Sequence, residues 1–357
     1  MERRQFIRNA LSVATVAATG KLVGGENTTG SRRAYRRIAC EEGFLISEVV
    51  AANEGLGDIG IPLITRNGPA AFLAELLCDI GDGRIAAMER DGIDMQLLML
   101  SAPGLQVFDR DTAIGLAREV NDQVSEACRR HPNRFAALAA MAPQAPERAA
   151  RELERAVTQL GLKGAIINSH TGGRYLDDPE FVPIFEALQD LRVPLYLHPR
   201  DPVPGIAQYM SNAVVDGAAW AYAVEVGTHA LRLIGSGIFD RYPDVQIVIG
   251  HMGEGLPFWL PRIDNRYQAA LRFANSKLEL LPSEYVHRNF HITTSGMNYM
   301  APLELSMEVL GIDRLLYASD YPFEKQGEAV AAVEAMPLSF EQKQALFEAN
   351  AVRVFAL

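Results

Sequence analysis

The stretch LLYASDYPFE, residues 315–324, sets a short apolar run directly before an aspartate and a proline. A run of this length and composition is typical of a buried β-strand. Asp320 then stands at the end of that strand, where barrel and open α/β enzymes keep their chemistry. Taken alone, Asp320 fits a helix N-cap equally well. The rest of the chain decides between the two interpretations.

Apolar runs followed by a turn or an ionisable group recur along the chain. The eight expected strands span residues 38–44, 95–102, 135–141, 164–169, 194–198, 245–250, 290–295 and 315–319. Helical patterns between them span residues 83–91, 111–131, 146–160, 181–191, 222–239, 300–310 and 328–335. Strands that alternate with helices predict parallel βαβ units.

Eight such units predict an α/β fold of the (β/α)8 TIM-barrel type, with a doubly wound sheet as the alternative. Two connections are long. Residues 45–77 follow the first expected strand and residues 200–219 follow the fifth. Long loops in a compact domain are usually functional, so we expect both to shape the catalytic face.

Composition excludes several classes of protein. The chain has 357 residues, 48% of them hydrophobic, and a net charge of -10, which argues against nucleic acid or an anionic membrane as partner. It has no 18-residue apolar run and so no integral membrane span is expected. Its three cysteines form no CxxC pair, it lacks the GxSxG and P-loop motifs, and no GxGxxG directly follows the first expected strand.

The first 30 residues differ from the rest. Arg3 and Arg4 precede a short Ala/Val/Thr stretch, and the arrangement resembles the twin-arginine export signal of bacteria. A functional leader predicts a periplasmic protein, whereas an amphipathic N-terminal helix on a cytoplasmic protein is the alternative. We expect residues 1–30 to be signal and linker, and residues 37–357 to form one domain.

Three strand ends carry ionisable groups besides Asp320. Glu41 and Glu42 close the first strand, and because side chains alternate along a strand they cannot both face inward. One is a possible ligand, and the other faces outward or caps the next element. His198 lies between the fifth apolar strand and Pro199, a context that favours a metal ligand over a core histidine.

Glycines surround the ionisable pair after the sixth strand, in the sequence GHMGEG. Glycine permits turns and a close backbone approach to a ligand. His251 is a candidate general acid or base, and Glu254 is placed to orient its imidazole. Asn168, at the end of the fourth strand, is a candidate donor to a substrate oxygen.

Glu41, His198 and Asp320 together offer one nitrogen and two carboxylate oxygens at the ends of strands one, five and eight. Closing a barrel brings the first and eighth strands side by side. Three ligands leave coordination positions open for substrate or water, as in catalytic metal sites. The oxygen-rich set favours Mn²⁺ or Mg²⁺ over Zn²⁺.

The motifs resemble those of one family, the metal-dependent decarboxylase branch of the amidohydrolase superfamily, and most closely the γ-resorcylate and 2,3-dihydroxybenzoate decarboxylases. That branch also contains aminocarboxymuconate semialdehyde decarboxylase. The resemblance covers roughly residues 38–357. It rests on the segments EEGF, YLHPRDP, IGHMGEGLPFWLPRID, HITTSG and ASDYPFE.

The resemblance implies that Glu41, His198 and Asp320 bind one divalent metal ion and that no organic cofactor is needed. It implies that His251 and Glu254 form a catalytic pair beside the substrate. Asp320 would be the proton donor as well as a metal ligand.

The resemblance also places Asn168, Arg262 and Phe323 beside the substrate. Gly43 departs from the γ-resorcylate enzymes, which have a histidine two residues after the first glutamate. The dihydroxybenzoate enzymes of fungi lack that histidine too, so three protein ligands remain compatible with metal binding. The family implies a homodimer or homotetramer.

The expected activity is non-oxidative decarboxylation of an ortho-hydroxylated aromatic acid. A metal-dependent hydrolase of a lactone, ester or amide is the alternative, because the same ligands can activate water. A non-catalytic binding protein is the third hypothesis, and Gly43 is the feature that favours it.

Overall fold

The computed structural model describes residues 34–56, 70–273 and 278–357. Tyr35–Leu357 group into one compact unit. The strands are β1 (Ile38–Phe44), β2 (Met95–Leu100), β3 (Phe135–Ala137), β4 (Ala139–Ala140), β5 (Ala165–Asn168), β6 (Leu195–His198), β7 (Ile247–Ile249), β8 (Phe290–Thr293) and β9 (Leu315–Leu316). Each of the eight expected strands is present at its predicted place.

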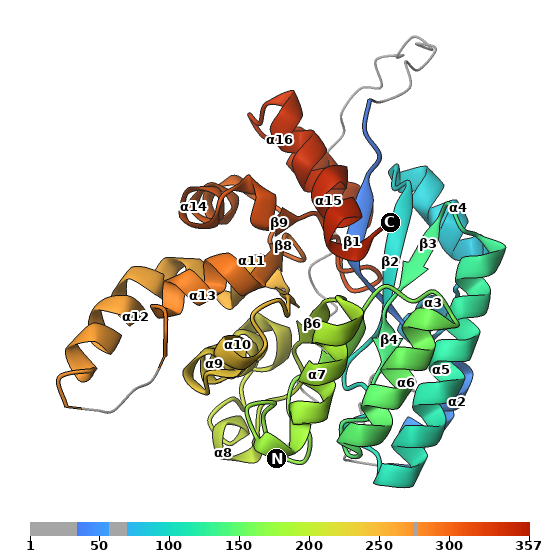
Figure 1. Ribbon diagram of the computed structural model, residues 1–357. Coiled ribbons are helices and arrows are strands. Elements are labelled where there is room, and N and C mark those ends of the chain that lie inside the picture. The colour runs from blue at the N-terminus through green and yellow to red at the C-terminus, as the bar shows by residue number, and fades with distance from the viewer. Residues whose placement is uncertain (1–33, 57–69, 274–277) are drawn as a thin grey trace. The chain divides into compact units, whose positions relative to one another are not determined.

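Helices separate the strands (Figure 1). The α-helices are α2 (Ser47–Glu54), α3 (Ala71–Cys78), α4 (Asp82–Asp91), α5 (Arg110–Arg130), α6 (Pro146–Thr158), α7 (Val182–Leu191), α8 (Pro204–Ala207), α9 (Ala221–Gly235), α10 (Ile238–Arg241), α11 (His251–Glu254), α12 (Leu256–Ala270), α13 (Pro282–Asn289), α14 (Met300–Leu310), α15 (Gln326–Glu334), α16 (Phe340–Gln344) and α17 (Asn350–Phe355). Shorter turns are η2 (Pro179–Phe181), η3 (Gly217–Ala219), η4 (Ile312–Arg314) and η5 (Ala345–Ala349). No helix in the described ranges is long and apolar enough to cross a bilayer.

Hydrogen bonds between neighbouring strands close the sheet into a barrel. The parallel ladders run β1-β2-β3 and β4-β5-β6-β7-β8-β9. The Leu138 amide donates to the carbonyl of Leu98 at 2.9 Å, so β3 and β4 are two halves of one strand. The Cys40 amide donates to the carbonyl of Tyr317 at 2.9 Å and joins β1 to the chain after β9. The predicted TIM barrel is confirmed, and Figure 1 shows β1 between β2 and β9.

The strands are buried on both faces, as expected where helices cover a parallel barrel. All seven residues of β1 are buried, its two glutamates included. Buried carboxylates need hydrogen bonds or charge partners, so both glutamates must be engaged inside the fold.

The two long connections contain short helices. Residues 45–77 include α2 and the start of α3, and residues 57–69 lie outside the described part of the chain. The second long connection, 200–219, contains α8 and η3. The predicted leader, residues 1–30, lies outside the described residues, so it and the proposed domain division stay predictions.

The segment after α11 forms a helix that the sequence analysis did not assign. Helix α12 carries Pro257 in its first turn and Pro261 inside it. Proline is tolerated in the first turn because the amide there has no partner within the helix. Pro261 breaks the usual pattern, which explains why periodicity alone did not indicate a helix.

Several strand-end residues adopt the left-handed backbone conformation that side chains rarely allow. The angle φ is 48° at Ser169, 50° at His251, 53° at Glu254 and 69° at Asp320. Such conformations cost about 1–3 kcal/mol each and persist only where surrounding contacts hold them. Three of the four belong to the predicted site.

Candidate active site

The Glu41 carboxylate is anchored through one oxygen and open at the other. Its Oε2 accepts hydrogen bonds from the hydroxyls of Tyr196 and Thr293, the latter at 2.6 Å. Its Oε1 has no hydrogen-bond partner among the described residues, although the side chain is fully buried. A buried carboxylate oxygen without a donor is costly unless a cation meets it.

Gly250 lets this carboxylate lie against the backbone. A Cβ at Gly250 would stand 2.7 Å from Oε1 and 2.8 Å from Oε2 of Glu41. Any side chain there would displace Glu41, so glycine is needed for close packing rather than only for a turn.

His198 enters from the end of β6 with its tautomer fixed by an amide. Its Nδ1 lies 2.8 Å from Oδ1 of Asn168, whose Nδ2 donates to the carbonyl of Leu100 at 3.3 Å. The amide oxygen can only accept, so Nδ1 of His198 carries the proton. Its Nε2 is left with a lone pair, 3.6 Å from Oε1 of Glu41. Burial lowers the pKa of His198 to about 4, so the ring is neutral, as a metal ligand must be.

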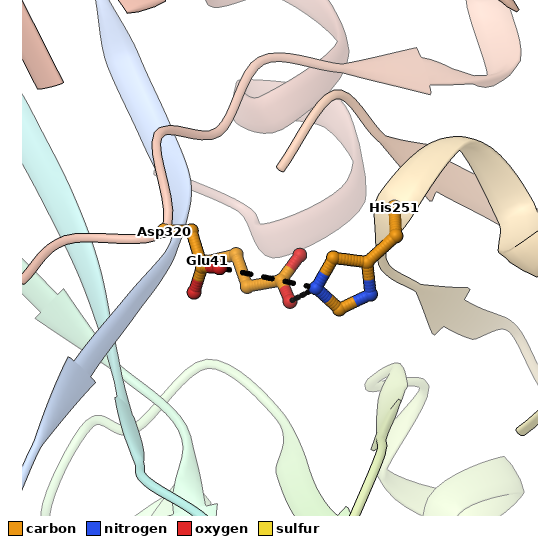
Figure 2. Close-up of side chains that lie close together, drawn as sticks. All are labelled: Glu41, His251 and Asp320. Atoms are coloured by element: carbon orange, nitrogen blue, oxygen red, sulfur yellow. Dashed lines mark ion pairs between the residues drawn. The ribbon is translucent and has the colours of Figure 1, made fainter. Parts of the chain in front are cut away.

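His251 approaches the same oxygen from the other side. Its Nδ1 lies 2.7 Å from Oε1 of Glu254. Its Nε2 lies 3.5 Å from Oε1 of Glu41 and 4.0 Å from Oδ2 of Asp320 (Figure 2). Burial lowers the pKa of His251, but the charges of Glu254 and Glu41 outweigh burial and hold it well above its usual range. The ring therefore favours its protonated form.

The pKa of Asp320 shifts in the same direction as that of His251. Burial, and then the nearby charge of Glu41, raise the pKa of its carboxyl well above the usual range. A carboxyl with a raised pKa is suited to act as an acid.

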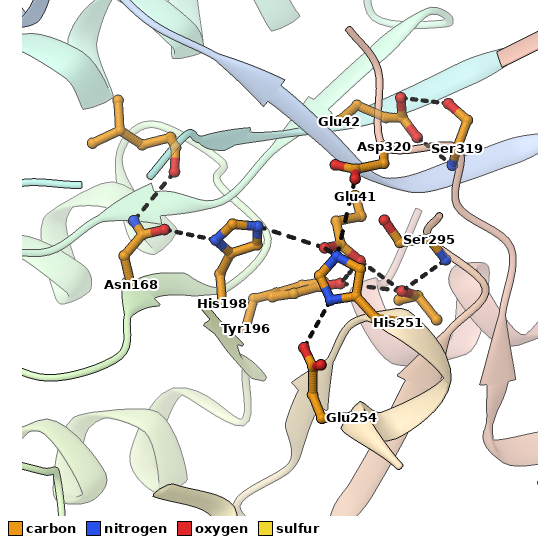
Figure 3. A network of polar contacts seen from close by, with 12 residues as sticks. Glu41, Glu42, Asn168, Tyr196, His198, His251, Glu254, Ser295, Ser319 and Asp320 are labelled. Carbon is orange, nitrogen blue, oxygen red and sulfur yellow. Dashed lines mark hydrogen bonds and ion pairs between the residues drawn. The ribbon is translucent and has the colours of Figure 1, made fainter. Parts of the chain in front are cut away.

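The residues form one continuous polar network (Figure 3). It runs from Asn168 through His198 and Glu41 to His251 and Glu254. Ligand atoms of Glu41, His251 and Asp320 lie within 4.8 Å of one another.

These donors fit a divalent cation. Two carboxylates and neutral imidazole nitrogen suit first-row divalent ions, and the open oxygen of Glu41 is the point on which they converge. The group of ligand atoms within 4.8 Å of one another includes His251. The predicted ligand set, Glu41, His198 and Asp320, has His198 in its place. The predicted set stays a prediction, with both histidines within reach of the same oxygen.

The predicted substrate residues lie in different environments. Asn168 is 1% exposed and engages His198 and Leu100 with its two polar atoms, so it orients a histidine. Phe323 is 45% exposed, and its ring reaches 3.5 Å from a Cβ placed on Gly43, beside the end of β1. Arg262 lies on α12 and lines a cavity of about 640 Å³ that Glu254 also lines.

Tyr196 and Thr293 were not among the predicted site residues. Tyr196 lies two residues before His198 on β6, and alternation along a strand places both on one face. That signal was present in the sequence. Thr293 follows no comparable rule, because its partner is 252 positions away in the chain.

Comparison with known proteins identifies related sequences over nearly the whole chain. The model of the amidohydrolase family matches residues 62–357. The γ-resorcylate decarboxylase of Rhizobium radiobacter is 37% identical, across 90% of this chain and 98% of that protein.

Solved structures agree with this match. The 5-carboxyvanillate decarboxylase of Sphingomonas paucimobilis is 41% identical, with a TM-score of 0.87 over 91% of this chain and 100% of that one. The Novosphingobium aromaticivorans enzyme, complexed with manganese and 4-hydroxy-3-methoxy-5-nitrobenzoic acid, is 40% identical, with a TM-score of 0.88 over 92% of this chain and 98% of that one.

Proposed function

The chain belongs to the amidohydrolase family, and from this premise we propose that it is a metal-dependent carboxy-lyase that decarboxylates a hydroxylated aromatic acid without oxidation. Its relatives include decarboxylases of γ-resorcylate and of 5-carboxyvanillate. The observation that carries the proposal is the open Oε1 of Glu41, which faces an acidic Asp320 and two imidazoles.

We propose that one divalent ion, Mn²⁺ or Mg²⁺ in preference to Zn²⁺, is held by Glu41, His198 and Asp320. The manganese in the related 5-carboxyvanillate decarboxylase supports this choice. When bound, such an ion supplies positive charge that gathers the substrate's carboxylate and ortho hydroxyl and stabilises the phenolate. An organic cofactor is not needed, because the electron-rich ring itself accepts the proton.

Asp320 delivers the proton. Its raised pKa leaves the carboxyl protonated, and it donates to the ring carbon that bears the carboxylate. A C–H bond forms, the C–C bond to the carboxylate breaks, and its electron pair restores the aromatic ring. Carbon dioxide leaves, and Asp320 regains a proton from solvent.

His251 and Glu254 interact with the hydroxyl group of the substrate. With both ring nitrogens protonated, His251 donates one hydrogen bond to Glu254 and one into the site, toward the phenolate oxygen. Phe323 supplies an apolar wall for the ring, and Arg262 offers a positive charge toward the substrate side. Asn168 contributes indirectly, because its hydrogen bond fixes the orientation of His198.

The test is a substrate panel under nitrogen. Protein loaded with Mn²⁺ is given ortho-hydroxybenzoates in parallel with lactones, esters and amides, and both CO₂ and released acid are measured. We expect CO₂ from at least one hydroxybenzoate, lost on metal chelation and restored by Mn²⁺. Acid release from a lactone or ester, with no CO₂ from any aromatic acid, would establish the hydrolase instead.

The hydrolase is the weaker alternative. A hydrolase of this type needs Asp320 as a base that takes a proton from water. The relatives that match over nearly the whole chain are decarboxylases, which favours Asp320 as an acid.

We propose that the N-terminal segment directs export to the periplasm. The basic start with Arg3 and Arg4, followed by a short apolar stretch, supports this. Fractionation of cells that produce the full chain, compared with an Arg3→Lys/Arg4→Lys variant, tests it. Equal cytoplasmic retention of both proteins would contradict export.

We propose that the protein is a homodimer or homotetramer. Phe258, Trp259 and Phe273 on and after α12 are 67%, 48% and 93% exposed, and a second copy would cover them. Light scattering on the purified chain gives its mass in solution. A monomer at micromolar concentration would contradict the proposal.

A further inference from the structure

Glu42 is a buried carboxylate next to Glu41 that faces away from the polar network. It lies on β1 with 0% exposure, and its hydrogen-bond partners Ser319 and Tyr321 are not those of Glu41. A buried charge without partners would be costly, so Glu42 must be held by other groups of the fold.

Glu42 grips the backbone on both sides of Asp320. Its Oε1 accepts from the Ser319 amide at 2.9 Å, and its Oε2 accepts from the Ser319 hydroxyl at 2.8 Å and the Tyr321 amide at 3.1 Å (Figure 3). The Gly43 amide also donates to the carbonyl of Tyr321 at 2.9 Å. The end of β1 therefore holds the residue before Asp320 and the residue after it.

These hydrogen bonds hold Asp320 in a backbone conformation that would otherwise be disfavoured. Asp320 has a φ of 69°, in the left-handed region where side chains are strained. In this conformation its Oδ2 lies 4.0 Å from Nε2 of His251. Release of the flanking amides would let the backbone relax and carry the carboxylate away.

Arg84 supports the same loop from α4. It is 1% exposed, its Nη2 donates to the carbonyl of Gly43 at 2.5 Å, and its guanidinium lies 4.9 Å from the ring centroid of Tyr321.

We propose that Glu42 is a positioning residue that sets the backbone of Asp320 and thereby aims its carboxylate at the metal and the substrate. This inference rests on the proposed role of Asp320. The two adjacent glutamates then divide the work, because Glu41 holds the metal directly while Glu42 holds the loop that presents the second carboxylate.

Two substitutions of Glu42 test separately whether the charge of its side chain and the length of its side chain matter. Glu42→Gln keeps the size but turns an amide donor toward backbone donors, and Glu42→Asp keeps the charge but shortens the reach by one methylene. We expect each to weaken Mn²⁺ binding by about tenfold or more, measured by calorimetry and by the Mn²⁺ resonance spectrum. At saturating Mn²⁺, kcat should fall by about tenfold to a hundredfold while KM changes less than threefold.

Glu225→Gln is the matched control. Glu225 is also a fully buried carboxylate with three donors, the hydroxyls of Ser169 and Tyr175 and the amide of Val203. We expect Glu225→Gln and Glu42→Gln both to lower Tm. Only Glu225→Gln should leave Mn²⁺ affinity within threefold of the wild-type value.

The outcomes are distinct. If either Glu42 variant folds and keeps wild-type Mn²⁺ affinity and kcat, the proposal is overturned. If Glu42→Gln does not fold, Glu42→Asp alone decides. If the wild type binds Mn²⁺ but releases no CO₂ from any acid, the proposed function fails, and the Mn²⁺ affinities still test the role of Glu42.

Discussion

Nε2 of His251 lies 3.5 Å from the open oxygen of Glu41, and Nε2 of His198 lies 3.6 Å from the same atom. Distance does not separate the two histidines, but the partner of each second nitrogen does. A neutral amide holds His198, and burial keeps its pKa at about 4. A carboxylate holds His251, and the surrounding charges raise its pKa. His198 is thus suited to hold a cation and His251 to hold a proton.

This difference predicts opposite phenotypes for a matched pair of variants. His198→Ala should lower Mn²⁺ affinity by at least about tenfold and abolish activity through metal loss. His251→Ala should keep the metal but lower kcat by about a hundredfold or more. Elemental analysis after dialysis, together with CO₂ release at saturating Mn²⁺, checks both. Metal loss from His251→Ala alone would reverse the assignment.

Asp320→Asn should remove the proton donor while keeping the size of the side chain. We expect CO₂ release to fall by about 10³-fold, within the range that general acids contribute. The amide oxygen can still meet a metal, so protein loaded at high Mn²⁺ serves as the control for occupancy. Full decarboxylase activity in Asp320→Asn would show that the proton comes from elsewhere.

Glu254→Gln should shift the pH dependence of the reaction. The charge of Glu254 helps hold the pKa of His251 above its usual range, so its removal lowers that pKa. The protonated ring is the working form, and activity is lost as pH rises through its pKa. The alkaline limb of the kcat/KM profile should therefore move to lower pH in the variant, with a loss of about tenfold or more at pH 8. An unchanged alkaline limb would exclude His251 as the titrating group.

Asn168→Leu should weaken the metal site without touching a ligand. The side chain keeps its size but no longer accepts from Nδ1 of His198, so the ring loses its fixed orientation. Mn²⁺ affinity should fall by about 10- to 100-fold. Asn121→Leu is the matched control, because Asn121 is equally buried and bonds only to Ala140 and Glu152. Equal loss of affinity in both variants would point to general destabilisation.

Gly43→His tests whether the missing histidine can be restored. A Cβ on Gly43 would stand 3.2 Å from Cδ2 of Leu77 and 3.5 Å from the Phe323 ring, so the space for an imidazole is already filled. We expect a loss of about 1–3 kcal/mol in stability, from thermal unfolding, and no gain in Mn²⁺ affinity. Gly43→His with Leu77→Ala provides room and is the comparison variant. A tenfold gain in affinity for the single variant would refute this.

Much of the architecture follows from local sequence patterns. Apolar runs of five to eight residues, each followed by a turn or an ionisable group, predicted every strand of the barrel and their order. The placement of Glu41, His198, His251 and Asp320 at strand ends followed from the same pattern. Parallel strands then bring those ends to one edge, so proximity of the four needed no further information.

Contacts between distant parts of the chain decided the roles. Alternation shows that Glu41 and Glu42 face opposite ways, but only the fold shows that Glu41 meets Thr293, 252 positions away, and that Glu42 meets Ser319, 277 positions away. The fold also places Asn168 against His198, a contact that the sequence did not indicate, while its predicted contact with substrate stays a prediction.

The physical reason is the range of the interactions. Strand and helix periodicity is set by neighbours within a few residues, so one sequence contains it. Hydrogen-bond partners and pKa shifts depend on which side chains the closed barrel brings within about 3–4 Å, and that depends on packing throughout the barrel. The sequence alone determined the barrel and its candidate ionisable groups. Only the tertiary structure decided which histidine has a lowered pKa and which a raised one, and which glutamate holds the loop of Asp320.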